Sequence, residues 1–223
     1  MIFNILLACV LTAAGGYLLG SILFGVLISK VMYNDDVRNH GSGNAGMTNV
    51  LRTYGKMPAV FTTLGDVGKS VAAVNLGRFI FGALLSGTGA AWQNPLDPVC
   101  GAYLAAIFCM IGHSRPIFFG FKGGKGILCG GTLAWMLGWK VGLVAWGLFA
   151  ALWLLSKYVS LGSIFAGVSL TVSVFLFYGH NLLYTALAFV ISVLVVWCHR
   201  ENINRLLHGT ERKFQWHSGP PKE

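Results

Sequence analysis

Residues that could bind an anion are concentrated in four polar segments of an otherwise apolar sequence. The first, GSGNAGMTN at residues 41–49, is followed by Arg52, which lies one helical turn after Thr48. Glycine permits backbone conformations in which successive N–H groups converge on an anion, and short polar side chains add further donors. A surface loop with a helix N-cap at Thr48 or Asn49 is the alternative, but it needs fewer donors. We therefore predict an anion site formed by Ser42, Asn44, Thr48, Asn49 and Arg52.

The second segment, GHSRPIFFGFKGGKG at residues 112–126, is basic and contains no acid: its charged or titratable residues are His113, Arg115, Lys122 and Lys125. Such a cluster beside a bilayer either meets lipid headgroups or binds an anionic substrate. It is not a Walker A loop, because that motif would need glycine at position 119 and Ser or Thr at position 126, where the chain has Phe119 and Gly126.

Two further ionisable residues, Asp66 and Lys69, lie three positions apart inside an apolar segment. The surrounding LGDVGKS resembles the end of a Walker A loop, but Thr63 stands where the first glycine would be. Charges within a membrane span are costly and normally pair or face an interior site. We expect a structural ion pair, with direct substrate contact as the alternative.

The third and fourth polar segments lie later in the chain. SKYVSLGSI at residues 156–164 offers Ser160 and Ser163, although a helix N-cap explains it equally well. In HRENINRLLHGTERK at residues 199–213, a short helix would align three polar side chains along one face, namely His199, Asn202 and Arg205. A basic amphipathic helix on anionic lipid is the alternative for this last segment.

Membrane-spanning helices must position these side chains. Hydrophobic residues make up 55% of the 223-residue chain and charged residues 10%, with a mean hydropathy of +0.68, whereas soluble domains are about 25% charged. We predict an all-α polytopic transmembrane helical bundle that forms a single membrane-embedded domain over residues 1–223. Spans are expected near 2–30, 58–86, 99–112, 126–139, 141–156, 161–178 and 182–198, followed by a cytoplasmic tail at 199–223. Hydropathy alone allows about six to eight spans, because the two expected spans on either side of Lys140 could be one long helix.

The distribution of positive charge favours seven spans. With seven, one side of the membrane receives all of the 16 lysines and arginines except Lys69, Arg78 and Lys140. The positive-inside rule then places the C-terminus in the cytoplasm and the N-terminus outside. The first cation is Lys30, so the N-terminal apolar run lacks the basic start of a cleavable signal peptide. All four polar segments would therefore face the cytoplasm.

Several catalytic signatures are missing from the sequence. It has no histidine followed by aspartate after four intervening residues, no G-x-S-x-G nucleophile elbow and no cluster with metal-ligand spacing. The five cysteines are scattered without a C-x-x-C pair. We therefore predict no metal, no cofactor and no nucleic-acid partner. The remaining chemistry is a cationic, hydroxyl- and amide-rich basin that positions phosphorylated substrates and stabilises charge.

Three motifs give the sequence a resemblance to a known family. They are GSILFGVLISK with DDVRNHGSGNAGMTNVLR, then GHSRPIFFGFKGGKG, and then HRENINRLLHGTE. From about Gly20 to Glu211 the chain resembles the bacterial integral-membrane acyl-phosphate:glycerol-3-phosphate acyltransferases, the PlsY family. The resemblance implies seven spans and an active site on the cytoplasmic face of the bacterial inner membrane. It also implies that an acyl group moves from acyl phosphate to the 1-hydroxyl of glycerol 3-phosphate, giving lysophosphatidic acid and phosphate in the first step of phospholipid synthesis.

The resemblance also implies roles for individual residues. The residues expected to be catalytic are Ser42, Arg52, Lys125, His199 and Asn202. Those expected to bind substrate are Asn44, Thr48, Asn49, Lys122, Gly123, Gly124, Ser160, Ser163, Arg200, Arg205, Asp66 and Lys69. The glycines with Lys125 would hold the acyl phosphate, and either Ser160 or Ser163 would add a phosphate donor.

The expected mechanism is direct attack by the substrate hydroxyl without an acyl-enzyme, because no serine has a histidine partner in sequence. Either a substrate phosphate oxygen or His199 would take the proton. A phosphate transporter is the rival class, but the sequence shows no internal repeat of the kind that transporters contain. A third possible class is a scaffold protein that binds anionic lipids, but such a protein would not require the segment GSGNAGMTN.

Overall fold

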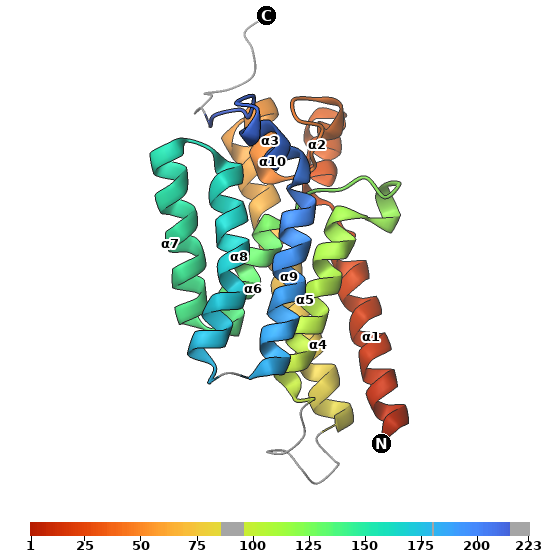
Figure 1. Ribbon diagram of the computed structural model, residues 1–223. Helices are drawn as coiled ribbons and strands as arrows, with labels where there is room; N and C mark the ends of the chain where they lie inside the picture. The colour runs from red at the N-terminus through yellow and green to blue at the C-terminus, as the bar shows by residue number, and fades with distance from the viewer. Residues whose placement is uncertain (86–95, 180, 215–223) are drawn as a thin grey trace, which may run out of the picture.

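The computed structural model describes residues 1–85, 96–179 and 181–214, and every regular element in these ranges is helical. The helices form an upright bundle, with α2, α3 and α10 at one end of it (Figure 1). The elements are α1 Ile2–Gly20, α2 Phe24–Tyr33, η1 Val37–Asn39, α3 Met47–Tyr54, α4 Lys56–Leu85, α5 Pro98–Ser114, η3 Ile117–Phe119, α6 Ile127–Leu137, α7 Trp139–Ser156, α8 Val159–Phe177, α9 Leu182–Cys198 and α10 Arg200–Leu207.

Within the described residues, five segments are long and apolar enough to cross a membrane: Ile2–Tyr33, Lys56–Leu85, Pro98–Phe119, Trp139–Ser156 and Val159–Phe177. The pair α9 and α10, bent by 57°, adds a sixth if it is one span, whereas α6 is a shorter apolar helix. The multi-span helical architecture is confirmed, and a total of seven spans stays a prediction. The N-terminus and α10 lie at opposite ends of the bundle (Figure 1). Residue 86 of the second expected span, and the tail from 215 with Lys222, lie outside the described residues.

The span expected near 2–30 is present as the apolar segment Ile2–Tyr33, but this segment consists of two helices, because the chain breaks between α1 and α2. Gly20 packs so closely on α5 that a Cβ at this position would lie 2.1 Å from the Cys109 carbonyl oxygen. The buried Lys69 Nζ donates to the carbonyl oxygens of Gly20, at 3.1 Å, and Ile22, at 2.6 Å. These two carbonyls flank the break, so the lysine of α4 satisfies backbone acceptors there.

The two expected spans on either side of Lys140 are separate helices. The chain is extended at Gly138, with φ 167° and ψ 143°, between the end of α6 and the start of α7. The Tyr178 hydroxyl donates to the Leu137 carbonyl at this turn. The possibility of one long helix is therefore excluded, and α6 and α7 pack side by side.

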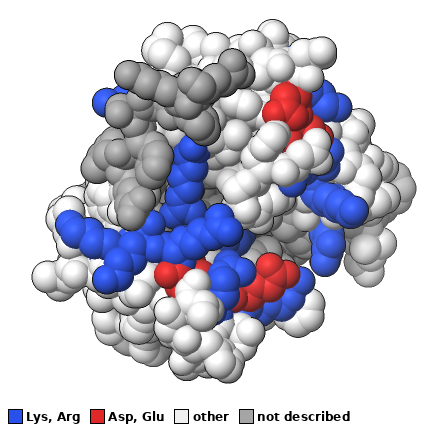
Figure 2. Space-filling model, turned by 90° about the horizontal axis from the view of Figure 1, so that it is seen from above, with Lys and Arg blue, Asp and Glu red and all other residues white. Residues whose placement is uncertain are grey.

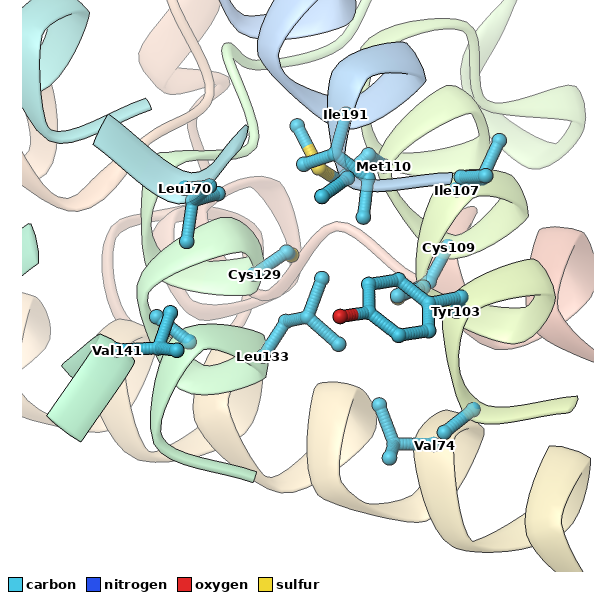
Figure 3. Packing of buried hydrophobic residues seen from close by; sticks show 14 of the residues in the cluster. Val74, Tyr103, Ile107, Cys109, Met110, Cys129, Leu133, Val141, Leu170 and Ile191 are labelled. Atoms are coloured by element: carbon cyan, nitrogen blue, oxygen red, sulfur yellow. The ribbon is translucent and has the colours of Figure 1, made fainter. Parts of the chain in front are cut away.

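The apolar core lies between α4, α5, α6, α7, α8 and α9. Side chains from these helices converge in Figure 3, and the buried residues among them include Val74, Tyr103, Leu133, Val141, Leu170 and Ile191. Three cysteines, Cys100, Cys109 and Cys129, are buried, and all five cysteines are free thiols. This core closes the bundle beneath the end that carries the polar segments.

Candidate active site

A cavity of about 420 Å³ opens where the polar segments meet the helical bundle. Its wall is built from the loop before α3, α3 itself, the start of α6, and parts of α7, α8, α9 and α10. Segments far apart in the sequence therefore contribute to one site. The predicted residues that line it are Ser42, Asn44, Thr48, Asn49, Arg52, Asp66, Lys125, Ser160, Ser163, His199, Asn202 and Arg205.

Five other predicted residues do not line this cavity: Lys69, Lys122, Gly123, Gly124 and Arg200. Lys122 is exposed, and its main-chain oxygen accepts a hydrogen bond of 2.9 Å from Arg38. Arg200 is exposed and lies over the Trp197 ring at 5.0 Å. The two glycines pack against α5, because a Cβ at Gly123 would lie 2.0 Å from the His113 carbonyl oxygen. The glycines thus let the loop approach α5 and place Lys125 at the cavity.

The loop at 41–46 is held in shape by the side chain of Asn49, which is 2% exposed. Its Nδ2 lies 3.0 Å from each of three carbonyl oxygens, and its Oδ1 accepts from the Ser42 backbone N–H, also at 3.0 Å. Helix α3 has Gly46 as its N-cap, so the alternative interpretation, a cap at Thr48 or Asn49, is wrong. Because both ends of the Asn49 amide bond to the backbone of this region, Asn49 fixes the shape of the loop. It thereby positions the exposed side chain of Ser42.

Replacing Asn49 with aspartate should lower kcat/KM about as much as replacing it with alanine. Aspartate keeps the acceptor for the Ser42 N–H but loses the two N–H donors that the Val37, His40 and Asn44 carbonyls share. Each unpaired buried acceptor costs about 1–3 kcal/mol. Steady-state kinetics of the acyl transfer that the resemblance implies, measured on purified variants, test this expectation, and near-normal activity of Asn49→Asp would show that the amide donors are dispensable.

His199 lies at the bend between α9 and α10 and is 2% exposed. Its Nδ1 is 2.8 Å from the Val195 carbonyl oxygen, which can only accept. Nδ1 therefore carries a proton, and Nε2 of the neutral ring is an acceptor. Nearby, Oδ1 of Asn202 is buried without a hydrogen-bond partner among the described residues. Two acceptors suited to a substrate hydroxyl thus lie on adjacent positions of the cavity wall.

The sequence analysis missed Glu211, which organises this side of the site. Its carboxylate accepts hydrogen bonds of 2.7 Å from Ser160 Oγ, Asn202 Nδ2 and Arg205 Nε. Burial alone would raise the pKa of Glu211, but these three donors hold it below its ordinary value. The sequence feature that could have indicated Glu211 is its position as the single acid in the basic stretch HGTERK. Because Ser163 Oγ also donates to the Val159 carbonyl, at 2.8 Å, both candidate serines have their hydroxyl donors in use.

The cavity contains positive charge that no acid directly neutralises. Among the described residues, neither Lys125 nor Arg52 forms an ion pair within 4.0 Å. Burial lowers the pKa of Lys125, although the charge of Glu211 opposes this shift, and burial also lowers the pKa of Arg52. Basic side chains gather on this face of the molecule around a few acids (Figure 2). Such a site is suited to an anion, and no group of three metal-ligating residues occurs in the described parts of the chain.

The expected ion pair between Asp66 and Lys69 is confirmed, with Lys69 Nζ 2.8 Å from Asp66 Oδ1 and both side chains 2% exposed. Lys69 Nζ also lies 2.9 Å from His113 Nδ1. His113 was not among the expected site residues, yet it lines the cavity together with Asp66. Lys69 thus contacts the break between α1 and α2, while its partner Asp66 lies in the cavity wall.

One arm of the cavity is apolar and runs between α6, α7, α8 and α9. Along α8 the lining changes from Ser160 and Ser163 to Ala166 and then Leu170. The α-helical rise of about 1.5 Å per residue places Leu170 roughly 15 Å from Ser160 along the helix axis. Trp146 and Phe149 of α7 face the same arm. A ligand with an anionic head and an apolar tail matches this gradient.

Comparison with known proteins identifies the family to which this chain belongs. Residues 10–209 match the family model described as Glycerol-3-phosphate acyltransferase. The chain is 39% identical over 205 residues to a glycerol-3-phosphate acyltransferase of Carboxydothermus hydrogenoformans, covering 92% of this chain and 96% of that protein. It is 41% identical over 209 residues to one of a Synechococcus species, covering 94% and 96% respectively.

Two solved structures are similar over nearly the whole chain. One is PlsY (YgiH), an integral membrane glycerol 3-phosphate acyltransferase, in its glycerol 3-phosphate form, with a TM-score of 0.78, 33% identity and coverage of 93% of this chain and 96% of that chain. The lysophosphatidic acid form gives a TM-score of 0.75 with 32% identity and coverage of 93% and 95%. The chain belongs to the glycerol-3-phosphate acyltransferase family, in its integral-membrane PlsY form.

Proposed function

We propose that this acyltransferase takes its acyl group from an acyl phosphate and transfers it to the 1-hydroxyl of glycerol 3-phosphate. The products are lysophosphatidic acid and inorganic phosphate. The observation that carries the proposal is a single cavity in which unneutralised cations, Lys125 and Arg52, stand at one end of an apolar arm. The forms in which PlsY has been solved, with glycerol 3-phosphate and with lysophosphatidic acid, support the acceptor and the product.

Within this cavity we assign the cations and donors to the two phosphates. Lys125, with Ser42 and Thr48, holds the phosphate of the acyl donor, and Arg52 with Arg205 holds that of glycerol 3-phosphate. A charge-assisted contact of this kind is roughly twice as strong as a neutral one. The acyl chain lies in the arm beside α7 and α8. No nucleotide or metal is needed for this assignment.

The reaction proceeds by direct attack, without an acyl-enzyme. The glycerol hydroxyl oxygen bonds to the acyl carbon, the bond from that carbon to the phosphate oxygen breaks, and the departing phosphate takes the hydroxyl proton, with His199 as the alternative base. Before the attack, either His199 Nε2 or Asn202 Oδ1 accepts the single hydrogen bond of this hydroxyl and orients it. Positioning two substrates in one cavity can supply about 7–11 kcal/mol of the barrier reduction.

We further propose that the chain is a single acyltransferase domain with seven spans, an outside N-terminus and a cytoplasmic active site in the bacterial inner membrane. The positions of the N-terminus and α10 at opposite ends of the bundle support an odd number of crossings (Figure 1). The basic face around the cavity supports a cytoplasmic orientation (Figure 2).

The donor is tested with purified protein, glycerol 3-phosphate and one of three donors: an acyl phosphate, an acyl thioester of coenzyme A, or an acylated carrier protein. We expect lysophosphatidic acid and equimolar phosphate with acyl phosphate alone. Turnover only with a thioester would refute the proposed donor. Mass spectrometry of the protein quenched during turnover should find no acylated serine or cysteine, and a trapped acyl-enzyme would refute direct attack.

Replacing Leu170 with tryptophan should shift preference toward shorter acyl chains. The cavity wall includes Leu170, and Leu133, Val141 and Ile191 pack in the core with it (Figure 3), so a larger side chain would shorten the apolar arm. We expect kcat/KM for palmitoyl phosphate to fall about tenfold relative to octanoyl phosphate. Leu170→Met conserves volume and is the control, and an unchanged ratio would place the acyl chain elsewhere.

A further inference from the structure

Arg38 lies in the short helix η1, before α3, and has no assigned role in the reaction. It is not among the described residues that line the cavity. Its Nη1 donates to the carbonyl oxygens of Phe119, at 2.8 Å, and Lys122, at 2.9 Å. Both carbonyls belong to the loop between α5 and α6, which lies at the same end of the bundle as α2 and α3 (Figure 1). The Arg38 side chain thus bridges the loop before α3 and the loop that leads into Lys125.

Asp36 fixes the orientation of the Arg38 guanidinium. Its carboxylate accepts from Arg38 Nε, at 3.0 Å, and from Nη2, at 2.7 Å. It also accepts from the Arg38 backbone N–H, at 3.0 Å, and so caps η1. A guanidinium is planar and presents its donors in a rigid fork, so the contacts of Nε and Nη2 also determine the direction of both Nη1 hydrogens. The bridge to the second loop is therefore a defined geometry that a lysine at this position would not reproduce.

At one end, the bridge is anchored to the hydrogen bonds that shape the Ser42 loop. Arg38 lies between Val37 and His40, whose carbonyl oxygens both accept from Asn49 Nδ2 at 3.0 Å. The Oδ1 atom of Asn49 accepts from the Ser42 N–H, also at 3.0 Å. The backbone on both sides of Arg38 is therefore tied to the residue that positions Ser42.

At the other end, the bridge holds the segment that leads directly to Lys125. The Lys122 carbonyl is one of its two acceptors. Two residues later, the Gly124 N–H donates to the His113 carbonyl oxygen of α5 at 2.9 Å. The backbone is thus held at Lys122 and at Gly124, immediately before Lys125, whose side chain lines the cavity.

We propose that Arg38 is a positioning residue that sets the separation between Ser42 and Lys125. This inference rests on the proposed function, in which these two residues hold the phosphate of one acyl donor. They come from different loops, so the geometry of that contact depends on how the two loops are joined. A misplacement of about 1 Å in such a contact can lower the rate about 10²-fold. Arg38 acts through both residues and does not touch the substrate.

A double-mutant cycle with Lys125 separates positioning from a general loss of structure. We expect Arg38→Ala to lower kcat/KM for the acyl donor about 10²-fold in the wild-type background. If Arg38 acts through Lys125, adding Arg38→Ala to Lys125→Met should lower kcat/KM by less than about threefold further. An equal loss in both backgrounds overturns the proposal, because a smaller fraction of correctly folded enzyme would reduce activity whichever residue is at position 125.

Arg38→Lys takes the same place in the cycle if Arg38→Ala does not fold. It keeps the positive charge beside Asp36 but loses the fork that reaches both carbonyls, so its kcat/KM should also fall and its effect should also disappear in Lys125→Met. Wild-type activity of Arg38→Lys would overturn the proposal, because the charge alone would then suffice. A wild-type enzyme that turns over only with a thioester would instead refute the proposed donor, and the coupling between residues 38 and 125, measured with that thioester, would still decide the role of Arg38.

Discussion

Replacing Lys125 with methionine is expected to lower kcat/KM by about 10²–10³-fold, the largest catalytic effect in the cavity. The methionine side chain keeps much of the buried aliphatic length but removes the ammonium that balances the phosphate of the donor. Arg52 is not expected to substitute for it, because Arg52 is assigned to the phosphate of glycerol 3-phosphate. Steady-state kinetics with varied acyl phosphate measure the loss. An enzyme within tenfold of wild type would show that the phosphate binds elsewhere.

Lys125→Arg is the matched control, because it keeps the charge but loses the lysine titration. Burial lowers the pKa of Lys125, so its charge is complete at low pH and is lost as pH rises through the lowered value. Wild-type activity should therefore decline at a pH below the ordinary lysine pKa. Arginine stays protonated throughout this range. The decline should disappear in Lys125→Arg, and a decline at the same pH in both enzymes would assign it to another group.

The sequence predicted the charged and hydroxyl residues of the site better than their roles. Ser42, Arg52, Lys125 and His199 were identified because donors and cations outnumber acids in segments that interrupt apolar runs, and this imbalance is visible in composition. Glu211 escaped notice because its importance depends on the tail folding back onto α8 and α10. Apart from the single acid in HGTERK, that tertiary contact leaves no local pattern in the sequence. It also uses the Ser160 hydroxyl, which had been expected to bind phosphate.

The helices were predictable from hydropathy, but their interruptions were not. The break between α1 and α2 lies within a continuous apolar run, and its cause is the close packing of Gly20 on α5 together with the donors of Lys69. In the same way, Gly123 and Gly124 were expected to hold phosphate. The structure shows that they allow the loop to contact His113, a role that requires the position of α5 to be known.

Replacing Asp66 with asparagine should destabilise the protein by about 3 kcal/mol, because it leaves the Lys69 ammonium buried without its counter-charge. Asparagine is nearly isosteric and can still accept one hydrogen bond, so the loss reports mainly the charge. The same change would weaken the hold of Lys69 on the carbonyls of Gly20 and Ile22 and on His113. The free energy of unfolding in mixed detergent micelles, from titration with sodium dodecyl sulfate, measures the effect.

A double substitution decides whether the charge or the hydrogen bonds dominate. Asp66→Asn combined with Lys69→Met removes both charges, and it should recover part of the stability lost in Asp66→Asn if the unpaired ammonium is the main cost. If the bonds to Gly20 and Ile22 dominate, the double variant should be less stable than Asp66→Asn, because methionine leaves both buried carbonyls without a donor. An Asp66→Asn protein as stable as wild type would contradict both interpretations. If the bonds to Gly20 and Ile22 dominate, the ion pair serves chiefly to anchor the broken helix.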